Sequence, residues 1–235
     1  MGINYFFYND RSSLDFNTFI SGEHTWDTPS KDIEVITVPG RNGTLSISNE
    51  RYENVPITYK CFIADDFSLN FDALKAYLLS QTGYKKLTDT YHPELYRLAR
   101  YEAGITPEMT QLNRHGEFEI TFDCDPRRFY IYSEGLSEIA TNTNIYNNTR
   151  FTANPLIRVY GTGSITVGDD IVTVTSADGY TDIDSELQEA YKGTTNCNSN
   201  ITLNNGVFPT LKPDNNLVTF SGFSKVEIAP RFWTI

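Results

Sequence analysis

The sequence predicts a mainly β protein built from two successive parts. Several segments alternate apolar and polar residues with a period of two, which is the pattern of half-buried strands. Phe and Tyr occur 15 times each, and both residue types are enriched in strands and at protein interfaces. The second half contains short apolar segments separated by turn residues about every 8–12 positions, which favours a β-sandwich.

The first half contains three strand candidates. Ile33–Val38 is apolar on both faces and is expected to be buried on both faces at its end, whereas Val55–Ile63 and Glu117–Cys124 place their apolar residues on one face only. Between the first two lies VPGRNGTL, at Val38–Leu45, in which a Pro-Gly and an Asn-Gly step fix a tight connection. Arg41 at this connection projects with little conformational freedom, so ion pairing there costs less ordering entropy.

One helix is predicted over Phe71–Ser80, because three apolar residues recur on one face: Phe71, Leu74 and Leu78, with Tyr77 beside them. Ser68 or Asn70 is expected to cap its start, with Asp72 in the first turn. Gly83 is expected to stop it. The helix is expected to cover one face of a sheet.

The composition of the chain changes after Pro126, where a polar, Asn-rich segment is followed by short apolar segments. The Asn-rich segment Thr141–Thr149 is interpreted as a loop or linker, and a hairpin turn is predicted at Gly168-Asp169-Asp170. The predicted fold is an N-terminal β-sandwich or split-barrel domain with one helix over residues 1–135, followed by a second β-sandwich over residues 136–235. The second sandwich is predicted from short apolar segments at Ile157/Val159, Ile165/Val167, Ile171–Val174, Leu217–Phe220 and Val226–Ile228.

Charge and cysteine content exclude several classes of function. The formal charge of −11 repels a polyanion, so nucleic-acid binding through phosphate neutralisation is disfavoured. The three cysteines form no CxxC pair for zinc or redox work, which indicates synthesis in a reducing compartment. No stretch approaches about 18 apolar residues, and the N-terminus lacks a basic signal-peptide region, so we expect no membrane association.

No catalytic set is recognisable. None of His24, His92 and His115 lies near a nucleophile motif such as GxSxG. Cys61 and Cys124 fall on apolar strand faces, where a thiol behaves as a small hydrophobe. We therefore predict no catalytic, cofactor-binding or metal-binding residue and no cofactor.

Two further features have a structural interpretation. Asp182, Asp184 and Glu186 in TDIDSELQEAY share a face if extended and could hold Ca²⁺, but a solvated strand edge or an intersubunit contact is favoured. Trp26 and Trp233 could stack on a sugar or anchor an interface, but partial burial in a domain core is favoured.

Five strings of the sequence now indicate a family. They are VPGRNG after a strand, FDCDPRRF, TDIDSELQEAY, GVFPTLKPDNN and the final PRFWTI. In order and spacing they resemble the distal tail proteins (Dit) of long-tailed phages (siphoviruses) of Gram-positive bacteria, over nearly the whole chain. The length matches the plain form of that family, without an inserted carbohydrate-binding module.

The resemblance implies a non-enzymatic protein of the virion tail tip, synthesised in the host cytoplasm. Its first domain would form a homohexameric ring that joins the tail tube protein to the tail-associated hub protein. Its second domain would be galectin-like and would dock receptor-binding or adaptor proteins. DNA would only pass through the lumen, which we expect to be acidic. The sugar-binding pattern of true galectins is missing, because no His follows His115.

Four residues are predicted to lie at interfaces. Arg41 is expected to contact a neighbouring chain or its own domain, and Arg127 and Arg128 to bridge the two domains. Trp233 is expected to tie the chain end back to the N-terminal domain. The alternatives are a tail-associated cell-wall glycan hydrolase, a stand-alone carbohydrate-binding module, or another β-rich tail protein such as the tube protein.

Overall fold

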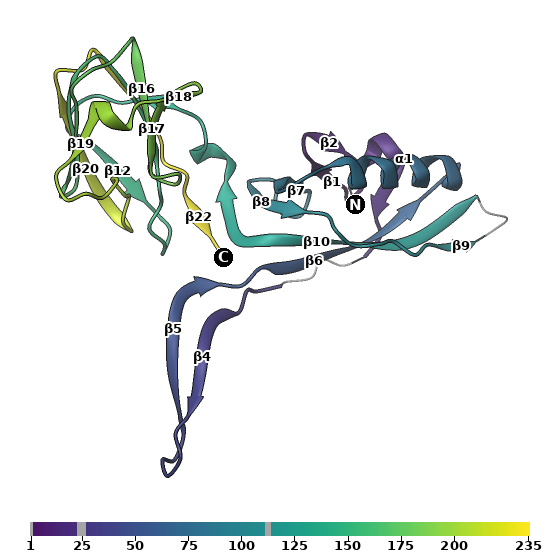
Figure 1. Cartoon of the computed structure of the whole chain (residues 1–235). Coiled ribbons are helices and arrows are strands. Elements are labelled where there is room, and N and C mark those ends of the chain that lie inside the picture. The colour runs from purple at the N-terminus through teal and green to yellow at the C-terminus, as the bar shows by residue number, and fades with distance from the viewer. Residues whose placement is uncertain (1, 23–26, 111–113) are drawn as a thin grey trace. The chain divides into compact units, whose positions relative to one another are not determined.

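The computed structural model describes residues 2–22, 27–110 and 114–235 (Figure 1). The chain divides into two compact units: unit 1 holds the residues up to 128 together with Ile235, and unit 2 holds residues 129–234. Strands dominate both units, which confirms the predicted fold class. No helix in the described residues is long and apolar enough to cross a membrane.

Unit 1 is built on one large sheet with strand order β2-β1-β7-β8-β10-β6-β3, and β9 pairs with β10. The pairing of β6 with β10 is antiparallel and runs without a break from Gly116 opposite Ile63 to Cys124 opposite Val55. Both predicted strands here are confirmed. The bounds are β1 (Phe6–Tyr8), β2 (Arg11–Ser12), the 3₁₀ helix η1 (Ser13–Phe16), β3 (Thr18–Ile20), β6 (Val55–Ile63), β7 (Lys85–Asp89), β8 (Leu95–Arg100), β9 (Glu108–Thr110) and β10 (His115–Tyr130).

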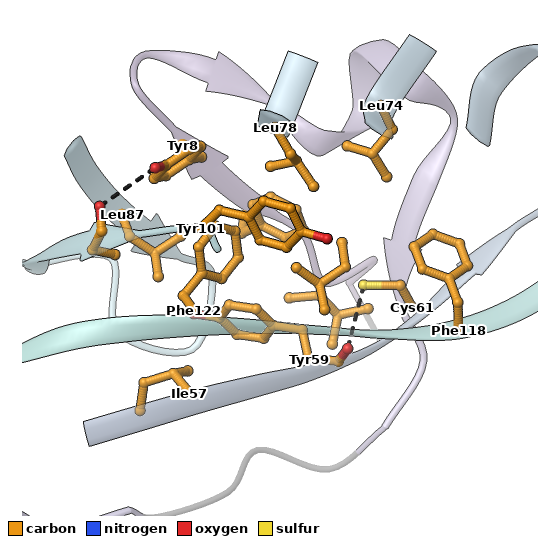
Figure 2. Packing of buried hydrophobic residues seen from close by; sticks show 14 of the residues in the cluster. Tyr8, Ile57, Tyr59, Cys61, Leu74, Leu78, Leu87, Tyr101, Phe118 and Phe122 are labelled. Atoms are coloured by element: carbon orange, nitrogen blue, oxygen red, sulfur yellow. Dashed lines mark hydrogen bonds between the residues drawn. The ribbon is translucent and has the colours of Figure 1, made fainter. Parts of the chain in front are cut away.

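The core of unit 1 lies between this sheet and α1 (Phe67–Ser80). Alternation along β6 turns its apolar side chains toward the helix, and Figure 2 shows Tyr59 and Cys61 from β6 beside Phe118 and Phe122 from β10. Leu74 and Leu78 descend onto them from the helix, as the helical spacing predicts. Burying these aromatic and aliphatic surfaces is the main favourable term in the folding of the unit.

The start of α1 differs from the prediction. The helix begins at Phe67, so Ser68 and Asn70 lie inside it and do not cap it, and no acidic residue occupies its first turn. Asp66 precedes it in a left-handed conformation without a side-chain capping bond. The extra turn forms because the Phe67 ring stacks on Phe71 at 5.2 Å between centroids, which extends the buried face.

Two further strands of unit 1 pair only with each other. β4 (Lys31–Thr37) and β5 (Thr44–Tyr52) form a two-stranded antiparallel sheet, visible in Figure 1 as a long hairpin. Its turn is the VPGRNG segment, in which Gly40 and Gly43 both adopt φ of +81°, a conformation that favours glycine. The two turn signals predicted from the sequence therefore set this connection.

Unit 2 is a sandwich of two sheets, with orders β11-β21-β13-β16-β17-β18 and β12-β20-β14-β15-β19. The hairpin predicted at Gly168 connects β14 to β15. The bounds are η2 (Ile131–Ser133), β11 (Ser137–Glu138), β12 (Thr143–Asn147), β13 (Leu156–Tyr160), β14 (Gly163–Val167), β15 (Asp170–Val174), β16 (Tyr180–Asp184), β17 (Glu189–Lys192), β18 (Thr195–Asn196), η3 (Asn198–Asn200), β19 (Ile201–Leu203), β20 (Asp214–Ser221), β21 (Lys225–Ala229) and β22 (Trp233–Thr234).

The inward residues of both sheets make the core of unit 2, including Ile157, Val159, Ile165 and Val167. All five short segments predicted for this half are strands.

The interpretation of Thr141–Thr149 as a loop is wrong, because β12 pairs with β20 through this segment. As an edge strand, β12 can expose Asn144, while the buried Asn147 donates hydrogen bonds to the carbonyls of Phe151 and Leu211 at 2.9 and 3.0 Å.

Candidate assembly interface

The β4–β5 hairpin is the candidate interface of unit 1, because it exposes apolar side chains along its whole length. Val35 is 60% exposed and Ile33 and Ile47 are each 45% exposed. The expected burial of Ile33–Val38 on both faces is therefore wrong within this chain, because β4 pairs only with β5 among the described strands. Exposed apolar residues in contiguous patches mark interaction sites on soluble proteins. An isolated two-stranded hairpin is marginally stable in water, so these strands gain stability when another surface covers them.

The register of the hairpin divides its side chains into two different faces. Ile33 and Val35 lie opposite Ser48 and Ser46, which gives one face of β-branched and hydroxyl residues. Ile36 lies opposite Leu45 on the other face, beside Ile47. Both outer edges carry backbone groups that no other described strand pairs, so the hairpin can accept a further strand on either side.

Arg41, the predicted contact residue, lies exposed at the tip of this hairpin. Its backbone N–H donates to the Val38 carbonyl at 3.2 Å, which closes the turn and fixes where the side chain leaves the backbone. No ion pair of Arg41 is found within the described residues. Its contact with a neighbouring chain stays a prediction.

Arg127 and Arg128 are adjacent in β10, yet their surroundings differ. Arg127 donates from Nε and Nη2 to the Asp125 carboxylate at 3.0 and 2.9 Å, so the two residues form a local fork. Arg128 lines a pocket in unit 1 together with Arg97. That these two arginines bridge the domains remains a prediction.

Trp233 is half-buried in unit 2. Its indole N–H donates to the Thr152 carbonyl at 2.9 Å, and its ring stacks on Phe151 with 4.2 Å between centroids. Partial burial was the interpretation favoured for this residue. The predicted tie to the N-terminal domain remains untested, and Trp26 and His24 lie outside the described residues.

The acidic segment TDIDSELQEAY forms ion pairs within unit 2. Arg158 binds the Asp182 carboxylate through two hydrogen bonds of 2.6 and 2.8 Å, and Arg231 binds Asp184 through two of 2.7 and 3.0 Å. Both aspartates are almost fully buried. The expected solvated strand edge is therefore wrong, because each carboxylate faces an arginine that sequence reasoning did not connect to it.

Asp184 is held in its charged form by these contacts. Burial raises the pKa of Asp184, but hydrogen bonds from Arg231 and from the backbone N–H of Leu187 outweigh burial and lower the pKa overall. Tyr191 adds a third donor, from its hydroxyl at 3.2 Å. A carboxylate with all its acceptor positions in use is a structural element and has little capacity left for a metal ion.

The cysteines and histidines of the sequence analysis lie in separate places. Cys61 and Cys124 are fully buried on apolar strand faces, as predicted, and burial raises the pKa of Cys124 to about 12. A thiol with that pKa is not a nucleophile at neutral pH. His115 stacks against Phe62 with 6.1 Å between centroids. No group of three potential metal ligands was found among the described residues.

Comparisons with known proteins relate these features to a family and a fold. Residues 13–124 match the family model of the phage tail protein RIFT-related domain. The crystal structure of SPP1 Dit (gp 19.1), described as a paradigm of the hub adsorption apparatus in phages that infect Gram-positive bacteria, matches with a TM-score of 0.78 and 16% identity. The match covers 100% of both chains. No curated protein sequence matches this chain.

The two comparisons support different parts of the identification. At 16% identity, the likeness to SPP1 Dit establishes the fold, and it extends over both units. The family model covers most of unit 1, including the hairpin and α1, and its description is that of a phage tail protein domain. The resemblance to Dit is confirmed at the level of the fold, and residues 13–124 carry a phage tail protein RIFT-related domain.

Proposed function

We propose that this chain is a structural hub protein of the phage tail tip, and that six copies form a ring through unit 1. In this role the ring joins the tail tube protein on one side to the tail-associated hub protein on the other. Receptor-binding or adaptor proteins dock on unit 2. The protein works by shape and assembly, and catalysis has no part in it.

The observation that carries this proposal is the β4–β5 hairpin. A monomer gains nothing from strands of seven and nine residues whose apolar side chains face water on both sides. In a ring, each hairpin covers its neighbour, and head-to-tail contacts close when their rotation returns to the first copy. Closure makes the contacts mutually dependent, so a moderate interface between two copies suffices to hold six.

The acidity of the chain suits a channel for DNA. With a formal charge of −11 per copy, a ring of six presents a field that repels the phosphate backbone. DNA then passes through the lumen without adhering to the wall. A ring structure with a strongly basic lumen would contradict this part of the proposal.

The test of the ring is the mass of the purified protein. Light scattering is expected to give six times the chain mass of 26.7 kDa, and negative-stain images are expected to show rings. Arg41→Ala is expected to reduce the hexamer fraction, whereas Arg150→Ala, at an exposed arginine of unit 2, is expected to leave it unchanged. If Arg41→Ala leaves the hexamer fraction unchanged, the proposed Arg41 contact is refuted but the proposed ring is not. A monomer that hydrolyses Gram-positive cell-wall glycans refutes the proposal.

A further inference from the structure

The half-buried arginines of the described residues follow a pattern with two exceptions. Four of the six contact a carboxylate at 2.6–2.9 Å: Arg100, Arg127, Arg158 and Arg231. The other two, Arg97 and Arg128, form no ion pair within the described residues. The chain has 30 acidic residues, so a shortage of carboxylates does not explain why Arg97 and Arg128 lack an ion pair.

Arg97 and Arg128 line the same pocket. Its volume is about 250 Å³, it is open to solvent, and all its lining residues belong to unit 1. Arg97 comes from β8 and Arg128 from β10, which are neighbours in the sheet, so the two cations meet from adjacent strands. Apolar side chains complete the wall, among them Leu87 and Leu95.

The Arg97 guanidinium is poorly satisfied in this pocket. It has five N–H donors, and within the described residues its hydrogen bond runs from Nη1 to the Pro126 carbonyl at 3.4 Å. Burial, and after it the charge of Arg128, lowers the pKa of Arg97. A buried cation is stabilised by a paired anion, and here the strongest charge effect on Arg97 comes from Arg128, which has the same sign.

The acidic residues of the wall do not fill this role. Asp27 and Asp89 line the pocket, together with His92 and Ile235, and no ion pair joins any of them to Arg97 or Arg128 within the described residues. The Asp89 carboxylate accepts from the Tyr59 hydroxyl at 2.7 Å and from two backbone N–H groups at 2.9 and 3.0 Å. Even with these carboxylates present, the surroundings of Arg97 disfavour its charge overall.

We propose that the Arg97–Arg128 pocket is an anion site that takes a carboxylate group on a short aliphatic stem. Planar guanidinium groups bind a carboxylate through paired hydrogen bonds, and the flanking Leu87 and Leu95 contact the methylene groups of the stem. A glutamate side chain or a small dicarboxylate has this chemistry. The first belongs to a neighbouring polypeptide, the second to a free metabolite.

The test uses the full chain and three probes: glutarate, the capped peptide acetyl-Gly-Glu-Gly-amide, and inorganic phosphate. Isothermal titration at low salt is expected to give saturable binding of a carboxylate probe and much weaker binding of phosphate. Glutaramide and the Gln version of the peptide are the neutral controls and are expected not to bind. Peptide binding without glutarate binding assigns the site to a polypeptide, and the reverse assigns it to a small molecule.

Variants locate the binding. Arg128→Met is expected to weaken binding by about tenfold or more, because a charge-assisted pair is lost. Arg97→Met is expected to do the same, and circular dichroism checks that each variant is folded. Arg150→Met, at an exposed arginine of unit 2, is the matched control and should bind like the wild type. The proposal is overturned if neither carboxylate probe binds saturably, if phosphate binds equally well, or if folded Arg128→Met binds unchanged.

Discussion

At the scale of single residues, the buried aspartates of unit 2 stand out. Asp184 accepts two hydrogen bonds from Arg231, one from Tyr191 and two from backbone N–H groups. Desolvating a carboxylate is costly, and a full set of donors offsets that cost. Removing the charge leaves the Arg231 guanidinium, itself half-buried, without its anion.

Asp184→Asn is expected to destabilise unit 2 by about 3–5 kcal/mol at pH 7, the usual cost of breaking a buried pair. The folded-state pKa of Asp184 lies below its unfolded value, so its contribution is present above about pH 4 and is lost as pH falls through the folded pKa. Urea unfolding at pH 7, 5 and 3 measures this, and the difference between wild type and variant should shrink with acid. Asp178→Asn, at a fully exposed carboxylate, is the control and should leave the free energy of unfolding nearly unchanged.

Residue-level prediction from sequence succeeded where the period of a strand decides burial. Cys61 and Cys124 lie on strand faces whose alternation is visible in the sequence, and both are fully buried. The partners of Asp184 could not be found this way, because Arg231 is 47 positions away and approaches only after the sandwich closes. For the same reason, the sequence did not predict that Arg97 and Arg128 line one pocket, since their strands are neighbours in space and not in sequence.

At the scale of elements, α1 sits close to its sheet because of a glycine. A Cβ placed on Gly116 in β10 would lie 2.2 Å from the Phe67 ring. Gly116→Ala is expected to push Phe67 aside and to destabilise unit 1 by about 1–3 kcal/mol through overpacking. Chemical denaturation checks this. Gly104→Ala, where a Cβ meets nothing within 4 Å, is the matched control and should be neutral.

Strand and helix periods predicted most elements, and the elements that were missed are set by tertiary contacts. The Phe67 turn of α1 was missed because Ser68 and Asn70 carry cap-forming side chains, and aromatic packing overrode that preference. The strand β12 was missed because an edge strand tolerates Asn on its exposed face. Both cases show tertiary contacts deciding against local propensity.

A charge on the β4–β5 hairpin tests its role as an interface. Val35→Glu is expected to abolish or strongly reduce oligomer formation, because burying an unpaired carboxylate in a contact is costly. Leu187→Glu in unit 2 is the control, since both side chains are 60% exposed and the same charge is added. Light scattering measures the mass of each variant. Equal oligomer fractions for the two variants would show that the hairpin does not take part in assembly.

At the scale of the whole molecule, two separate cores divide the chain. Phe122, Leu74 and their neighbours form one cluster, and Ile157, Val218 and theirs form the other. Two domains were predicted from the change of composition after Pro126. The place of the division is harder to predict, because β10 runs without interruption from His115 to Tyr130 while the compact units part between Arg128 and Phe129.

Two cores predict two unfolding transitions. Each unit buries its own apolar cluster, and cooperativity is a property of a single core, so calorimetry of the dilute protein is expected to resolve two melting events. Asp184→Asn should lower one of them by several degrees, and Gly116→Ala should lower the other. The double variant should show both shifts, because the sites lie in different units and share no partner. A single transition that both substitutions move together would mean that the units unfold as one body, and the two clusters would then have to be treated as parts of one cooperative core.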